Sequence, residues 1–154
     1  MVARRLAAEL LNQRVDSRLP RIRDYAERLG VGNGTVQAAL QLLENTGALR
    51  TEARGHLGTY LREVDRADLW RLAGLGTMLA AMPLPYSRRY EGLATGLRAA
   101  FEEAEIPFAL TFMRGAQARL DALMSGKVDL IVVSRLAFDA FGEGSRLSQL
   151  ADLG

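Results

Sequence analysis

The chain has 154 residues, of which 49% are hydrophobic and 25% are charged, a composition that can fill a packed core and excludes a disordered chain. It contains no Cys and a single His, His56, which excludes disulfides, thiolate catalysis and a Cys/His zinc cluster. Residues 1–66 carry eleven Arg and eight acids (+3), and residues 67–154 carry nine cations and ten acids (−1), a mild asymmetry that is compatible with nucleic acid binding by the first part.

Three apolar stripes at helical spacing occupy residues 3–47, and the first predicts an amphipathic helix over 3–13. After a break at Pro20, the second stripe runs up to Gly30, which is expected to end its helix in the left-handed conformation. The third stripe ends at Gly47. Two short helices joined by a glycine-containing turn form a helix-turn-helix signature. The stripes are Ala3, Leu6, Leu10 and Leu11; Ile22, Tyr25, Ala26 and Leu29; and Val36, Ala39, Leu40 and Leu43.

After Gly47 the pattern changes from helical to alternating. The stretch "ALRTEARGHLGTYL" has Gly55 and Gly58 at its centre and predicts two strands, roughly 48–53 and 58–62, that are joined by a turn. A β-hairpin directly after the second helix of a helix-turn-helix is a wing. We therefore expect residues 1–62 to form a winged helix-turn-helix DNA-binding domain.

Residues 18–61 resemble the winged helix-turn-helix of GntR-type bacterial regulators. This chain departs from the family pattern at the turn and early in the third helix. The family commonly has Ser-Arg in the turn and an Arg after the Thr-Val pair, whereas this chain has Gly32, Asn33 and Gln37. The matching positions are Leu19-Pro20, Arg23, Ala26, Leu29-Gly30-Val31, Thr35-Val36, Ala39-Leu40, Leu43-Glu44, Gly47 and Gly58-Thr59.

The third helix has no Lys or Arg between Asn33 and Asn45, yet its polar residues suit a recognition helix. Gln and Asn can bond adenine bidentately, and Thr can contact a thymine methyl group. Charge for the phosphates can come from the start of the second helix and from the wing. The alternative is that these Gln side chains only form a solvated face. The predicted DNA contacts are Asn33, Thr35, Gln37 and Gln41 for the bases, with Arg21, Arg23, Arg54 and His56 around them.

Residues 63–76 read as a linker with a short helical turn, and residues 77–154 alternate between strands and helices. The order is strand, helix, strand, helix, strand, and "KVDLIVVS" has the continuous apolar character of a strand covered on both faces. This order implies parallel pairing with right-handed crossovers. The fold class is therefore α/β overall, with the winged helix-turn-helix followed by a partial parallel α/β lobe.

Ligands of such sheets bind outside the carboxyl ends of the strands, beside helix N-termini. Here the rule selects the loops at 85–90, 114–117 and 134–135, each of which carries an Arg beside a hydroxyl or amide group. A small carboxylate or phosphate is the ligand expected from this chemistry. The alternative is that these are ordinary surface arginines. The predicted ligand-binding residues are Ser87, Arg88, Arg89, Arg114 and Ser134.

Residues 76–134 resemble the first lobe of type 2 periplasmic-binding-protein folds, which serve as effector domains in many regulators. The best cue is "LDALMSGKVDLIVVS", with its leucine-rich helix, Gly and Asp-bearing strand. Together with the winged helix, "MPLPYSRRYEGLATGL" further resembles the YhfZ-like group of regulators, whose members join these two modules. The resemblance implies a regulator whose α/β part senses an effector.

The combined interpretation is a bacterial transcriptional regulator that binds double-stranded DNA, senses a small anionic metabolite and forms a homodimer. Paired half-sites would supply the specificity that one small winged helix lacks. The chain has no stretch near ~20 apolar residues and no signal-peptide core, so we expect a cytoplasmic protein with no membrane partner. We expect no enzyme activity, no metal and no cofactor, because no nucleophile–base pair is apparent and Asp129 reads as structural.

Two further expectations remain. The competing class is a small-molecule-binding protein or enzyme with a periplasmic-binding-protein-like fold, whose N-terminal module binds protein and not DNA. In addition, 85 residues follow Leu69, fewer than a two-lobed effector domain needs, and Gly142, Gly144 and Ser145 interrupt the tail. We therefore expect a fragment of a longer chain, or a form whose open sheet a partner chain covers, with weak or absent ligand binding.

Overall fold

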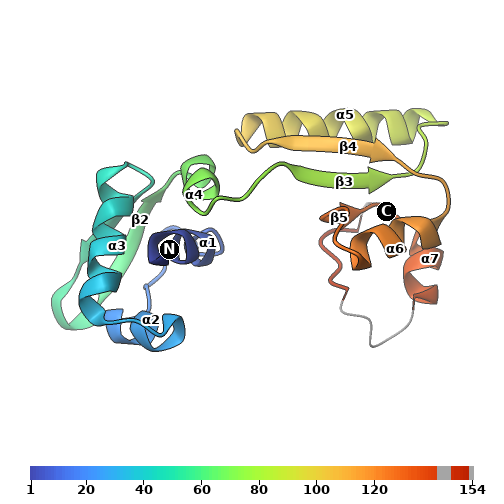
Figure 1. Ribbon diagram of the computed structural model, residues 1–154. Coiled ribbons are helices and arrows are strands. Elements are labelled where there is room, and N and C mark those ends of the chain that lie inside the picture. Colours follow the sequence, from blue (N-terminus) through green and yellow to red (C-terminus); the bar gives the residue numbers. More distant parts are fainter. Residues whose placement is uncertain (142–146, 153–154) are drawn as a thin grey trace. The chain divides into compact units, whose positions relative to one another are not determined.

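The computed structural model describes residues 1–141 and 147–152, so the tail positions Gly142, Gly144 and Ser145 lie outside the described residues. The chain forms two compact units (Figure 1). The first comprises residues 1–77 together with 103–106, and the second comprises the rest.

The first unit is a helical domain with a two-stranded hairpin. Its core is a single apolar cluster to which every helix contributes, and the fully buried side chains include Leu6, Tyr25, Val36, Leu61 and Leu69. The predicted stripes thus face one core. The elements are α1 (Val2–Leu10), α2 (Ile22–Leu29), α3 (Asn33–Asn45), β1 (Leu49–Ala53), the 3-10 turn η1 (Gly55–Leu57), β2 (Thr59–Val64) and α4 (Arg66–Leu72).

The turn between α2 and α3 follows from one glycine. Gly30 has φ 67° and ψ 39°, a left-handed conformation that a residue with a Cβ adopts only at a cost. The N–H of Val31 then donates to the carbonyl of Ala26 at 3.0 Å, which satisfies a carbonyl in the last turn of α2. Gly32 is extended and α3 begins at Asn33, so the two helices of the helix-turn-helix follow each other within a few residues.

The wing is an antiparallel hairpin whose register runs from Leu49 opposite Val64 to Ala53 opposite Thr59. Its second strand extends two residues further than expected, to Val64. Helix α4 lies in the segment we expected to be a linker. Leu69 from α4 is fully buried in the core cluster of the first unit, and the exposed fraction of its neighbour Ala67 is 6%.

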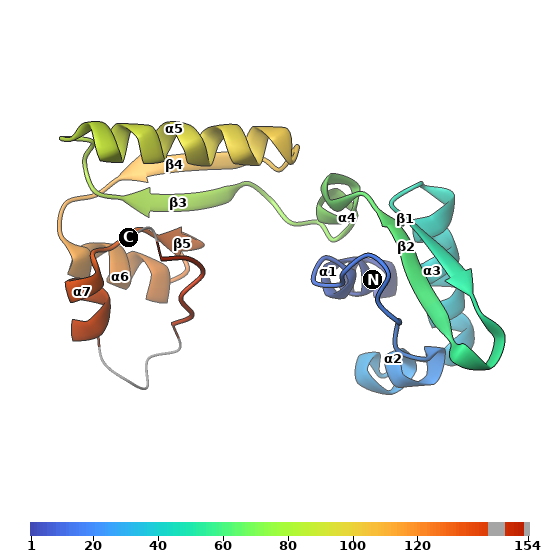
Figure 2. The same cartoon turned by 180° about the vertical axis from the view of Figure 1, so that it is seen from behind.

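The second unit is a three-stranded parallel sheet with the order β4-β3-β5. Figures 1 and 2 both show α5 on one side of this sheet and α6 on the other. As predicted, consecutive strands are parallel and joined through helices. The elements are β3 (Met78–Met82), α5 (Arg88–Glu103), β4 (Phe108–Phe112), α6 (Ala116–Met124), β5 (Leu130–Ile131) and α7 (Arg135–Ala140).

The third strand is shorter than its apolar sequence indicates. Only Leu130 and Ile131 pair as a strand, opposite Ala80 and Ala81. At the preceding position the carboxylate of Asp129 accepts the N–H of Leu79 at 2.8 Å, while the Asp129 N–H donates to the Leu79 carbonyl at 2.8 Å. A side chain therefore replaces the backbone acceptor at the start of this strand, and Asp129 has the structural role expected for it.

Candidate nucleic-acid interface and ligand pocket

Helix α3 has one face in the core and one face open to solvent. Val36 and Leu43 are fully buried, and Ala39 is nearly so. The opposite face is made of exposed residues, and none of the thirteen residues of α3 is a Lys or Arg. This exposed face therefore presents amide and hydroxyl groups and no cationic side chain. The predicted base contacts Asn33, Thr35, Gln37 and Gln41 all lie on this exposed side, together with Ala38, Leu42 and Asn45.

Two cations stand at the start of α2, where they were predicted. Arg21 precedes the helix, and its backbone N–H donates to the Asp24 carboxylate at 3.0 Å. The Arg23 guanidinium lies 3.4 Å from the other oxygen of Asp24, with both side chains largely exposed. Among the described residues, none accepts a hydrogen bond from the guanidinium of Arg21. Of the two, Arg21 is thus the cation that is free to meet a phosphate.

The wing cation Arg54 is already paired. Its Nε and Nη2 atoms lie 3.1 and 3.4 Å from the two carboxylate oxygens of Glu52, and its guanidinium lies 4.9 Å from the centre of the Tyr60 ring. This hydrogen bond holds the pKa of Glu52 below its usual value. Glu52 also pairs with Arg62 at 2.9 Å, and Arg62 pairs with Asp16. The charge of Arg54 is therefore compensated within the wing.

His56 lies in the 3-10 turn at the tip of the wing and is exposed. In the part of the chain that the structure describes, its ring makes no hydrogen bond or ion pair. The predicted DNA contacts thus come from three elements of one unit: the start of α2, the exposed face of α3 and the wing.

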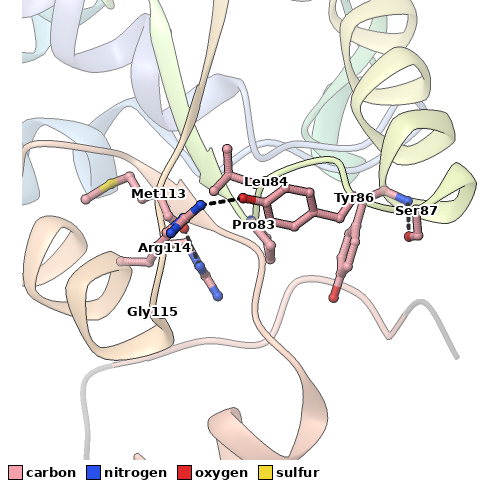
Figure 3. Close-up of a pocket in the computed structure, with 9 residues that line it drawn as sticks. Pro83, Leu84, Tyr86, Ser87, Met113, Arg114 and Gly115 are labelled. Carbon is pink, nitrogen blue, oxygen red and sulfur yellow. Dashed lines mark hydrogen bonds between the residues drawn. The ribbon is translucent and has the colours of Figure 1, made fainter.

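A pocket of about 330 Å³ lies in the second unit, where the chain leaves β3 and β4 (Figure 3). Because the two strands are parallel, their carboxyl ends meet at this edge of the sheet. The Nη2 atom of Arg114 donates to the Tyr86 hydroxyl at 2.7 Å, which links the two loops. The lining is apolar apart from a few polar groups. The residues are Pro83, Leu84, Tyr86, Ser87, Tyr90, Met113, Arg114, Gly115 and Arg119.

Arg119 is the pocket residue that sequence reasoning missed. Its exposed fraction is 5%, and it is the one buried polar or charged residue in the part of the chain that the structure describes. Its Nη1 donates to the Met113 carbonyl at 2.6 Å, whereas its buried Nε has no partner there. Burial lowers the pKa of this guanidinium. A signal was present in the sequence, because Arg119 falls three residues after Ala116 and three before the buried Ala122, a spacing that places it on the inward side of α6.

The structure brings only some of the predicted ligand residues to this pocket. Ser87 and Arg114 line it. Arg88 and Arg89 are exposed at the start of α5 and do not contribute to its walls. Ser134 begins α7, where its hydroxyl accepts the N–H of Ala137 at 3.2 Å, and it does not reach the pocket either.

Two negative findings bear on function. Over the described residues, no group of three or more His, Cys, Asp or Glu side chains is placed to hold a metal ion. Over the same residues, no helix is long and apolar enough to cross a bilayer.

The fold and its exposed α3 face place the first unit among helix-turn-helix domains, the class found in DNA-binding regulators. Residues 14–61 match the family described as "Helix-turn-helix domain", and residues 65–154 match "YhfZ C-terminal domain". The chain belongs to the YhfZ family, as the sequence resemblance indicated.

Two relatives illustrate the family. The chain is 42% identical over 149 residues to a protein of Escherichia coli (strain K12) described as "Uncharacterized protein YhfZ", a match that covers 97% of this chain and 49% of the relative. The crystal structure of YhfZ from Shigella flexneri matches 44% of this chain and 31% of that chain at 49% identity, with a TM-score of 0.41. The chain thus spans about half the length of the curated relative it matches.

Proposed function

We propose that the protein is a cytoplasmic DNA-binding transcriptional regulator that acts as a homodimer and responds to a small anionic metabolite. The observation that carries this proposal is the exposed face of α3. Thr35, Gln37 and Gln41 are all solvent-exposed on a helix whose opposite side buries Val36 and Leu43 completely. A helix held in this way can enter the major groove and present hydrogen-bonding groups to base edges.

The first unit has separate groups for contacts with bases and for contacts with phosphates, and this supports the proposal. The neutral face of α3 reads bases, while Arg21, the wing and the N-terminal N–H groups of α3 position it on the phosphates. A single domain of this size buries little surface on DNA, so two copies on adjacent half-sites supply the specificity. The homodimer follows from this requirement.

The sensing part of the proposal rests on the pocket at the carboxyl ends of β3 and β4. Arg114 and Arg119 give it a positive character, and Pro83, Leu84 and Met113 give it apolar walls. This combination suits a small organic anion. It also favours the alternative class, a small-molecule-binding protein whose N-terminal unit does not bind DNA. The lining residues include no His, Cys, Asp or Glu that could act as a general base in catalysis.

The test is the salt dependence of binding to duplex DNA, followed by selection of bound sequences from a random duplex pool. The whole chain is titrated with mixed duplexes between 50 and 200 mM salt. A regulator is expected to lose affinity steeply, with a slope of about −0.9 for each phosphate contact, and to enrich a two-fold symmetric site. No measurable binding at 50 mM salt would leave the alternative class as the better description.

A further inference from the structure

We propose that the pocket of the second unit binds a small organic monocarboxylate, and that the buried guanidinium of Arg119 is the group that holds the carboxylate. This inference rests on the proposed function in one respect: the bound carboxylate would be the effector. It differs from the sequence-based hypothesis because the central cation comes from inside α6 and not from the exposed loops.

The first argument is the uncompensated charge of Arg119. Only 5% of the residue is exposed, and no Asp or Glu among the described residues pairs with it. Its polar contact is a single backbone carbonyl, that of Met113. A buried cation with one neutral acceptor is costly, because desolvation of the charge is barely offset. An anion in the adjacent pocket would remove that cost.

The second argument is the geometry of the guanidinium. Its Nη1 atom is occupied by the Met113 carbonyl, whereas its Nε atom is buried without any acceptor. The edge formed by Nε and Nη2 is the side of the fork that binds both oxygens of a carboxylate. The contact with Met113 therefore orients Arg119 and leaves this edge unused.

The third argument concerns the size and charge of the ligand. The pocket has about 330 Å³, with apolar walls from Pro83, Leu84 and Met113. One buried positive charge matches a singly charged group better than a phosphate dianion, which needs more donors than this interior offers. Arg114 and Tyr86 are joined at 2.7 Å and line the same pocket with exposed side chains.

The experiment follows the side-chain Nε–H signals of ¹⁵N-labelled protein by NMR while butyrate is added. NMR detects weak binding, and butyrate carries one carboxylate on a short apolar body. Saturable movement of the Arg119 signal is expected. Butyramide, which has nearly the same shape without the charge, and inorganic phosphate are each expected to bind at least tenfold more weakly. No saturable change with butyrate, or equal binding of butyramide, would overturn the proposal.

Variants separate a binding role of Arg119 from a structural one. Arg119→Met keeps most of the side-chain volume and is expected to abolish saturation by butyrate, while Arg119→Lys should weaken it at least tenfold because the planar fork is lost. If Arg119→Met fails to fold, Arg114→Gln at the exposed rim should still lower the affinity for butyrate by about threefold or more. Arg98→Gln, an exposed arginine of α5 outside the pocket, is the control and should change nothing. Unchanged affinity in Arg114→Gln and Arg119→Lys together would reject the site.

DNA binding measured on the same samples keeps the two proposals apart. Butyrate binding without salt-dependent DNA binding supports the carboxylate site and rejects the regulator. DNA binding without butyrate binding supports the regulator and rejects the carboxylate site.

Discussion

The carboxylate of Glu44, near the end of α3, accepts two hydrogen bonds from Thr51 in β1. The Thr51 hydroxyl lies 2.6 Å and the Thr51 N–H lies 3.1 Å from the same Oε1 atom. The strand pairing shifts by one residue between Arg50 and Thr51, so Glu44 binds the first strand where the hairpin is irregular. This pair connects the proposed recognition helix directly to the first strand of the wing.

Loss of this pair should destabilise the first unit. Thr51→Val and Glu44→Gln are each expected to lower the free energy of unfolding by about 1–3 kcal/mol, the range for hydrogen bonds to a charged, half-buried group. The double variant should cost less than the sum, because both changes weaken the same bond between the Thr51 hydroxyl and the Glu44 carboxylate. Urea unfolding followed by fluorescence of Trp70, the sole Trp, measures the first unit. Glu63→Gln is the control: its ion pair with Arg50 is largely exposed and should contribute under about 1 kcal/mol.

Base reading by α3 predicts a local change in specificity. Gln37→Ala should relax the preference at one base pair by about 1–3 kcal/mol and leave the salt slope nearly unchanged, because an amide pairs with a base edge and releases no counterion. Selection of bound duplexes before and after the substitution gives the result. Asn45→Ala, at the far end of the same exposed face, is the matched control. If Gln37→Ala preserves the sequence preference and His56→Ala alters it, the wing reads the DNA.

The sequence predicted the elements whose signals are local. The three stripes and the glycines that end α2 and α3 depend on neighbours within one or two helical turns. Gly30 accordingly has the expected positive φ of 67°, and the hairpin follows where the alternation begins. The order of strands and helices in the second unit was predictable for the same reason.

The features that the sequence did not predict depend on which particular groups meet in the folded chain, whether these lie far apart or close together in the sequence. The Asp129 carboxylate takes the place of a backbone acceptor for Leu79, fifty positions away, directly before the short strand β5. Arg119 is buried against the Met113 carbonyl, although an arginine is expected at the surface. The spacing of residues does not show which carboxylate pairs with which guanidinium. The pairing of Arg54 with Glu52 could therefore not be predicted from the sequence either.

That pairing leads to a prediction about salt dependence. Glu52→Gln removes the acid that compensates Arg54 and Arg62, so affinity for all duplexes should rise and the salt slope should steepen by up to about one. Arg21→Gln should do the opposite and flatten the slope by about one, because its guanidinium has no acceptor among the described residues. The measurement is binding to one duplex at several salt concentrations. Arg98→Gln, in the second unit, should leave the slope as it is. An unchanged affinity and slope in Glu52→Gln would show that the wing does not approach the phosphates.

Tyr25 predicts how the first unit responds to alkaline pH. The residue is 1% exposed, and its hydroxyl is buried with no hydrogen-bond partner among the described residues. Burial raises the pKa of Tyr25 from 10.0 to about 12, against a smaller opposing effect of Arg28. Because the folded-state pKa lies above the unfolded one, the contribution of Tyr25 is fully present below pH 10 and is lost as the pH rises through 12. The loss should approach roughly 2–3 kcal/mol, since each pKa unit corresponds to about 1.4 kcal/mol.

Tyr25→Phe isolates this effect, because it removes the unpartnered hydroxyl and keeps the ring in the core. At pH 7 the variant should be as stable as the wild type or more stable by about 1 kcal/mol, since an unsatisfied buried hydroxyl is lost. Between pH 10 and 12 its stability should fall less steeply, so the advantage over the wild type widens. Urea unfolding at intervals of pH, followed through Trp70, measures the difference. Tyr86→Phe is the control, because it leaves the protein with the same number of tyrosines as Tyr25→Phe. The Tyr86 side chain belongs to the second unit and is 75% exposed. This variant should retain the wild-type dependence of stability on pH. Parallel profiles for Tyr25→Phe and Tyr86→Phe would mean that the Tyr25 hydroxyl ionises equally easily in the folded and the unfolded chain, and so is accessible to water in solution.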